Sequence, residues 1–169
     1  MQIVFENSPR GALVDDWRNG GFGIYIHWPF CAAKCPYCDF NSHVATSIDQ
    51  TSWQNAYLKE IDRYAVITKG RILNSVFFGG GTPSLMSPDV VSAILDRINY
   101  HWPKANNFEC TLEANPTSVE AGRFNEYSMA GVNRISMGIQ SLRDKDLIAL
   151  GRMHSVQEAI QAFDIARKY

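Results

Sequence analysis

Residues 75–88 read SVFFGGGTPSLMSP, and this stretch contains a complete junction between a strand and a helix. The apolar run 76–78 is typical of a strand that is buried on both faces. The three glycines that follow end the strand in a tight loop. Ser87 and Pro88 then supply an N-cap and a first-turn proline, which predict that a helix begins here.

The same order of strand and helix recurs along the chain. The predicted strands are 23–28, 75–79, 108–113 and 134–139. The predicted helices lie at about 48–68, from 88 onward, at 118–130, at 144–150, and after a capping box of Ser155 and Glu158. In the last helix Ala159, Ile160, Ala162, Phe163 and Ala166 are expected to face inward. This alternation predicts an α/β fold with a parallel sheet and right-handed crossovers.

The ends of the chain suggest that the fold is incomplete. Residues 1–22 show no regular period and are expected to form a poorly ordered leader. Four strands cannot close a barrel, so residues 23–169 are expected to be one partial domain, truncated at its carboxyl end. The last strand would leave an open edge. We therefore expect the chain alone to be poorly soluble or dimeric.

Composition limits the classes of partner. The 169 residues carry a net charge of −1, which argues against a nucleic-acid partner. No apolar run is long enough to cross a bilayer, so membrane association would be transient at most. The first residues do not resemble a secretory signal. The expected location is therefore the cytoplasm, where cysteines stay reduced.

Polar and glycine-rich motifs follow the predicted strands. In parallel α/β folds, loops at the carboxyl ends of the strands meet at one edge and carry the chemistry. Here those loops hold the cysteines of residues 31–38, GGGTPS at 79–84, EANP at 113–116 and QS at 140–141. The sequence thus predicts one composite site.

The spacing of Cys31, Cys35 and Cys38 is C-x3-C-x2-C. Thiolates suit zinc, copper(I) and iron–sulfur clusters. Three of them would leave one iron of a four-iron cluster open for a substrate, whereas His27 or His43 would complete a zinc site. Cys110 lies within a predicted strand and is expected to be a small buried hydrophobe.

The wider pattern resembles the radical S-adenosylmethionine superfamily. The resemblance rests on YIHWPFC at 25–31, the three cysteines and GGGTP at 79–83, and more narrowly it is to the oxygen-independent coproporphyrinogen III oxidase-like family. It extends through LEANP at 112–116, NRISMGIQ at 133–140 and LGRMH at 150–154. It implies that the four β/α units are the amino-terminal part of a TIM-type radical SAM barrel.

The resemblance also implies roles for individual residues. Cys31, Cys35 and Cys38 would bind a [4Fe–4S] cluster, and S-adenosylmethionine would chelate the open iron. An electron donor of the flavodoxin or ferredoxin type would then trigger release of a 5′-deoxyadenosyl radical. The implied S-adenosylmethionine pocket contains Tyr25, Tyr37, Gly80, Gly81, Thr82, Glu113, Gln140 and Arg152. The glycines would let the backbone approach the methionine part closely.

One departure narrows the resemblance further. The coproporphyrinogen III dehydrogenases have another cysteine two positions after the third ligand, where this chain has Phe40. CDFNS at 38–42 is similar to the haem chaperone branch, whose members bind haem or porphyrin and pass haem to an acceptor protein. The alternatives are a dehydrogenase that decarboxylates coproporphyrinogen III and a zinc-stabilised structural domain. Whether the protein is an enzyme stays open, and this length of chain is expected to be inactive alone.

Overall fold

A parallel four-stranded sheet forms the centre of the computed structural model, which describes residues 17–169. The strand order is β1-β4-β5-β6, and every neighbouring pair is parallel. The bounds are β1 Gly23–Trp28, β4 Leu73–Gly80, β5 Lys104–Ala114 and β6 Arg134–Met137. A separate small sheet pairs β2, Phe30–Cys31, with β3, His43–Val44. The predicted α/β fold with a parallel sheet is confirmed.

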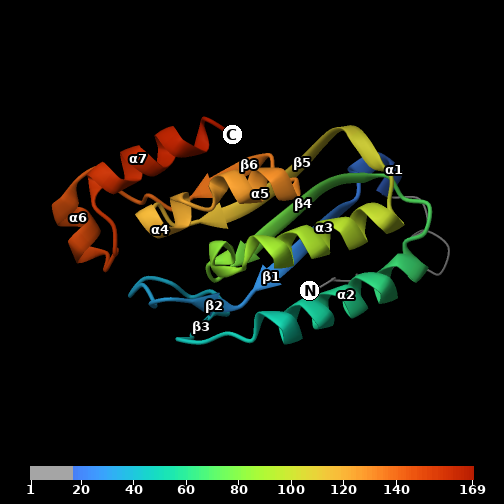
Figure 1. Ribbon diagram of the computed structural model, residues 1–169, viewed down its shortest axis with the longest axis horizontal. Helices are drawn as coiled ribbons and strands as arrows, with labels where there is room; N and C mark the ends of the chain where they lie inside the picture. The colour runs from blue at the N-terminus through green and yellow to red at the C-terminus, as the bar shows by residue number, and fades with distance from the viewer. Residues whose placement is uncertain (1–16) are drawn as a thin grey trace.

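Helices connect the strands and cover one face of the sheet (Figure 1). They are α1 Trp17–Gly20, α2 Gln50–Ile67, α3 Pro88–His101, α4 Ser118–Ala121, α5 Phe124–Ala130, α6 Asp144–Ala149 and α7 Val156–Ala166, with a 3-10 turn η1 at Pro83–Leu85. Helix α2 packs on α3, α3 on α5, and α4 on α7. The predicted caps are present: Ser87 accepts from the Val90 amide, and Ser155 and Glu158 form a capping box.

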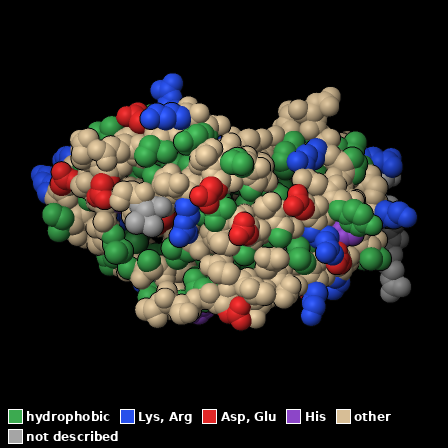
Figure 2. All heavy atoms as spheres, viewed as in Figure 1, with side chains coloured by type: hydrophobic (Ala, Val, Ile, Leu, Met, Phe, Trp, Pro, Cys, Tyr) green, Lys and Arg blue, Asp and Glu red, His purple; other side chains and the backbone are tan. Residues whose placement is uncertain are grey.

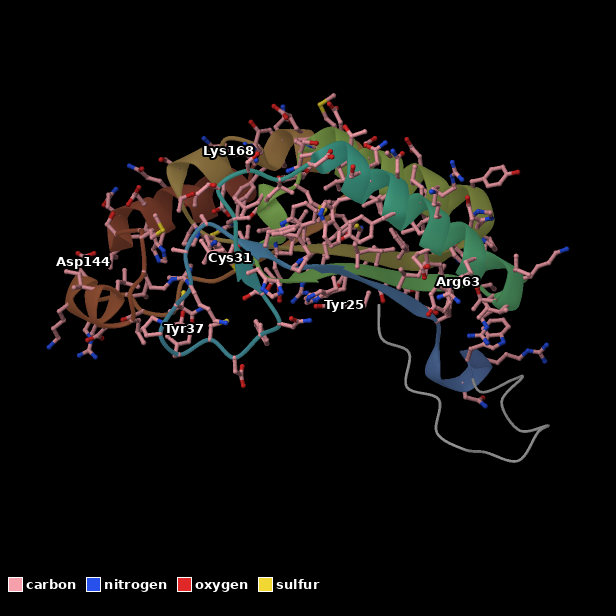
Figure 3. All side chains as sticks on the ribbon, turned by 90° about the horizontal axis from the view of Figure 1, so that it is seen from below. Tyr25, Cys31, Tyr37, Arg63, Asp144 and Lys168 are labelled. Carbon is pink, nitrogen blue, oxygen red and sulfur yellow. The ribbon has the colours of Figure 1, made fainter. Side chains whose placement is uncertain are left out.

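The core lies between the sheet and these helices. Alternate residues of each strand point into it, as the two-residue period of a strand requires. On β1 these are Ile24, Ile26 and Trp28, and on β4 Val76 and Phe78, all of them buried. The opposite face of the sheet carries no helix among the described residues, and Figure 3 shows Tyr25 on that side. The helices therefore leave one face of the sheet uncovered.

Three details differ from the sequence prediction. Strand β5 begins at Lys104 and not at the predicted residue 108. Four polar or small residues precede its apolar part, which starts at Phe108. The helix predicted at 118–130 is two helices, separated at Gly122 and Arg123, where glycine is a weak helix former. In α7, Ile160 and Phe163 are 46% and 49% exposed, so the prediction that they face inward was wrong. The prediction is confirmed for Ala159 and Ala162, which lie one turn apart and are buried.

The first sixteen residues of the expected leader lie outside the described residues. Its last part forms α1 and continues into Phe22, whose ring centroid lies 5.8 Å from that of Trp102.

Within residues 17–169, the structure contains no helix with the length and apolar character needed to cross a membrane. On the face drawn in Figure 2, basic and acidic side chains are interspersed with no large area of one sign.

Candidate cofactor site

One cavity of about 730 Å³ lies at the carboxyl edge of the sheet. Its walls come from the cysteine loop (residues 31–42), the glycine loop (residues 79–84) and the segments after β5 and β6. Every predicted site residue except Tyr25 lines it. These residues are Cys31, Cys35, Tyr37, Cys38, Gly80, Gly81, Thr82, Glu113, Gln140 and Arg152. The expected meeting of the motifs at one edge is confirmed.

The cysteine loop presents three free thiols to this cavity. Cys31 is buried at the end of β2, whereas Cys35 and Cys38 are partly exposed. The β2–β3 pair closes the loop at its base, where the His43 amide donates to the Pro29 carbonyl at 2.7 Å. Figure 3 shows Cys31 and Tyr37 at the same end of the sheet. The loop is therefore anchored at both ends, with Cys31 in the anchoring strand β2 and Cys35 and Cys38 in the segment between β2 and β3.

The arrangement of donors bears on which group the thiols could hold. Among residues 17–169, no three His, Cys, Asp or Glu side chains are grouped so as to hold a single metal ion. The chemistry of the three cysteines on the cavity wall suits soft metals, because thiolates are ligands of iron–sulfur clusters as well as of zinc.

Cys110 is separate from this site. It lies on β5 with its side chain in the core and is 0% exposed. Burial raises the pKa of its thiol to about 12, so the reactive thiolate is disfavoured. This confirms the prediction that Cys110 is a small buried hydrophobe.

The glycine loop is pressed against the segment that leads into the cysteine loop. A Cβ atom on Gly80, whose φ is 114°, would lie 2.6 Å from Nδ1 of His27. The Gly81 and Thr82 amides donate to the Trp28 and Phe30 carbonyls, each at 2.7 Å. The structure thus gives an intramolecular reason for these glycines, besides the approach of a cofactor implied by the resemblance.

Glu113 lies at the end of β5 and is half-buried in the cavity wall. Its Oε2 accepts a hydrogen bond from the Gly80 amide at 3.2 Å. Burial raises the pKa of the carboxyl group, and this hydrogen bond opposes the shift. A carboxylate that is partly desolvated is well suited to accept a hydrogen bond from a cationic ligand group.

Arg152 connects three parts of the wall. Its Nη1 donates to Sγ of Cys35 at 3.2 Å and to the Tyr37 hydroxyl at 3.3 Å. Its Nη2 donates to Oδ1 of Asn115 and to the Gly138 carbonyl, both at 2.7 Å. Its Nε is buried and has no hydrogen-bond partner within residues 17–169. Besides its place in the pocket that the resemblance implies, Arg152 thus joins the cysteine loop to the segments after β5 and β6.

Gln140 adopts φ 71°, the only positive φ of a non-glycine residue in the part of the chain that the structure describes. Such a conformation is costly for a residue with a side chain, and it is concentrated at functional sites. Its side chain is exposed at the cavity. The geometry is compatible with a hydrogen bond from the amide to a ligand hydroxyl.

Tyr25 lies outside the cavity wall. It sits on the uncovered face of β1, 44% exposed, with its hydroxyl 3.3 Å from Nδ1 of His27. Burial and then the charge of Glu113 raise the pKa of its phenol. Of all the predicted site residues, Tyr25 is thus the one that the structure does not bring into the cavity.

Sequence reasoning missed two polar residues of the wall. Asn115 was quoted within a motif but not given a role, and Glu120 was not singled out. Glu120 occupies the position three residues after the N-cap Thr117, where an acidic residue ordinarily serves the helix end. The sequence therefore offered no signal that its side chain turns toward the cavity. His154, at the end of the same motif as Arg152, is buried, and its Nε2 lies 3.1 Å from the Ile139 carbonyl oxygen.

Comparison with known families agrees with this arrangement. Residues 25–169 match the Radical SAM superfamily. The chain belongs to the radical SAM superfamily. It is 44% identical over 144 residues to the heme chaperone HemW of Escherichia coli (strain K12), covering 85% of this chain and 38% of that protein.

Other radical SAM relatives give the same picture. The chain is 41% identical over 145 residues to the mitochondrial radical S-adenosyl methionine domain-containing protein 1 of Bos taurus, covering 86% of this chain and 33% of that protein. The solved structure of coproporphyrinogen III oxidase (HemN) from Escherichia coli superposes with a TM-score of 0.78 at 24% identity, over 86% of this chain and 34% of that one. The chain therefore spans well under half the length of the relatives it matches.

Proposed function

We propose that Cys31, Cys35 and Cys38 bind a [4Fe–4S] cluster and that S-adenosylmethionine binds beside it. The observation that carries this proposal is that three free thiols, a carboxylate and a guanidinium face one cavity. Cysteine thiolates are the usual ligands of iron–sulfur clusters. A set of three leaves one of four irons without a protein ligand, and an open position at a metal is what substrate binding requires.

Each cavity residue would bind a different group of S-adenosylmethionine. The carboxylate of Glu113 would accept from the ammonium group, and Arg152 would pair with the carboxylate of the methionine part. The Gln140 amide would bond the ribose hydroxyls, and the Tyr37 ring would lie against the adenine. The chemistry supplied by the bound cluster is one-electron reduction of the sulfonium. The chain itself holds the reacting groups in place and limits the access of water.

For the whole protein, we propose a haem chaperone that binds haem or a porphyrin and passes haem to an acceptor protein in the cytoplasm. Relatives that carry the name heme chaperone are 44% and 45% identical to this chain. Phe40, in place of a further cysteine, is 60% exposed on the cavity wall. At this position the chain therefore has an apolar ring where the dehydrogenase pattern has a thiol. A flavodoxin- or ferredoxin-type protein would supply the electron.

The test compares two activities of the full-length protein under anaerobic conditions. The first assay follows transfer of haem to an apo-acceptor haemoprotein, and the second follows conversion of coproporphyrinogen III. Transfer of haem without formation of protoporphyrinogen IX is the expected result. Formation of protoporphyrinogen without haem transfer would replace the chaperone by a dehydrogenase. A colourless protein with stoichiometric zinc would support a structural zinc domain instead.

A further inference from the structure

A continuous chain of hydrogen bonds runs from the glycine loop to the cysteine loop through the segment after β5. It begins at Ser84, whose hydroxyl donates to Oε2 of Glu120. The same carboxylate oxygen accepts from the backbone amide of Asn115 at 2.8 Å. Oδ1 of Asn115 then accepts from Arg152, which also donates to Cys35. Four side chains thus connect residues that are far apart in the sequence.

The chemistry of the partners fixes the orientation of the Asn115 amide. Arginine can only donate and a carboxylate can only accept, so Oδ1 must face Arg152. Nδ2 is then left to donate to Oε1 of Glu120 and to Oγ1 of Thr82, both at 3.4 Å. Asn115 therefore connects the cation to the carboxylate in one orientation only.

Glu120 is unusual for a residue in the first turn of a helix. It is 7% exposed, and burying a carboxylate is costly unless hydrogen bonds compensate. Its backbone amide donates the usual capping hydrogen bond to Oγ1 of Thr117, whereas its side chain accepts from the Ser84 hydroxyl and the Asn115 backbone amide. The hydrogen bonds from Ser84 and Asn115 compensate for this burial. They join Glu120 to the glycine loop and to the segment after β5, contacts that a helix cap does not require.

We propose that Glu120 is a positioning residue of the cofactor site, which couples the glycine loop to the cysteine loop through Asn115 and Arg152. This inference rests on the proposed function for its purpose, because coupled loops would hold S-adenosylmethionine and the cluster ligands in one geometry. The coupling itself is a property of the protein without cofactors. It can therefore be measured whether or not the cluster forms.

The experiment measures amide hydrogen exchange by mass spectrometry on the full chain, reduced and free of metal. The variants are Glu120→Ala, Glu120→Gln, Asn115→Ala and Arg152→Lys. Glu126→Gln, an exposed carboxylate on α5, is the matched control. Exchange is followed in peptides from the glycine loop and in peptides from the cysteine loop.

Glu120→Ala should speed exchange about fivefold in both loops, since removal of hydrogen bonds in a coupled network lowers the free energy of local opening. Glu120→Gln keeps an acceptor oxygen and should restore most of the protection. Arg152→Lys should loosen the cysteine loop, and adding Glu120→Ala should loosen that loop no further. Glu126→Gln should match the parent.

Faster exchange in the glycine loop with an unchanged cysteine loop would overturn the proposal, because it would make Glu120 a local structural residue. If Glu120→Ala loses its cooperative melting transition, Asn115→Ala decides. It removes the side-chain contacts of Asn115 with Arg152 and Thr82 and leaves the Glu120 carboxylate in place, so an unchanged cysteine loop would again contradict coupling. Failure of the parent to take up iron and sulfide would count against the proposed function alone.

Discussion

Gly81 lies so close to Phe30 that a Cβ atom on the glycine would be 2.6 Å from the Phe30 carbonyl oxygen. That oxygen also accepts from the Thr82 amide at 2.7 Å, so it is held in place. The glycine loop and the start of the cysteine loop therefore fit together through backbone alone. This contact places the cavity wall made by one loop against the wall made by the other.

Gly81→Ala should destabilise the protein by about 1–3 kcal/mol, as expected for overpacking against atoms that cannot move away. The free energy of unfolding by urea measures the effect. Gly20→Ala is the matched control, because a Cβ there meets no atom within 4 Å. Equal stability of the two variants would show that the loops have room to separate.

Glu113→Gln should weaken binding of S-adenosylmethionine about tenfold and leave the iron content unchanged, because a charged acceptor is replaced by a neutral one. Isothermal titration of the reconstituted protein gives the affinity. Glu109→Gln changes an exposed carboxylate on the same strand and should have no effect. An unaltered affinity in Glu113→Gln would remove this carboxylate from the pocket.

His154 predicts a dependence of stability on pH. Burial lowers its pKa, the Ile139 carbonyl opposes this, and the charge of Arg152 adds to the lowering. In the unfolded chain the pKa is about 6.5, so below that pH the unfolded state binds a proton that the folded state resists. The contribution of His154 is thus complete above about pH 6.5 and is lost as the pH falls toward the folded value.

The measurement is urea unfolding of the parent and of His154→Gln between about pH 5.5 and 7.5, a window around the ordinary histidine pKa. The parent should lose stability more steeply toward low pH than the variant, whose amide can still donate to Ile139. His43→Gln, at an exposed position, should follow the parent. Parallel curves for the parent and His154→Gln would refute this role.

The order of strands and helices was predictable because burial leaves a regular pattern in the sequence. The caps at Ser87 and Ser155 were predictable for another reason: a helix cap is an interaction between residues that are close in the sequence. The start of β5 was not predictable, because Lys104 pairs with Leu73 of β4 only within the sheet, before the register shifts to the pair of Ser75 and Glu109. The exposed Ile160 and Phe163 show that an apolar residue on a helix need not face the described core.

The meeting of the three cysteines with the other motifs at one cavity was predictable, because each motif follows a predicted strand. Tyr25 was expected in the pocket from its place in a motif, yet its position on β1 points it to the uncovered face beside His27. Glu120 and Asn115 gave no signal, because their partners come from other loops. Long-range hydrogen bonds of this kind depend on the fold and are absent from local sequence patterns.

The most direct test of the account is the iron and acid-labile sulfide content of anaerobically reconstituted protein, together with the EPR spectrum after reduction. The parent and Cys110→Ala should bind about four irons and four sulfides per chain, as a cluster of this type contains. The variant with Cys31, Cys35 and Cys38 all changed to alanine should bind none. Retention of the parent's iron, sulfide and spectrum by that triple variant would contradict the central claim.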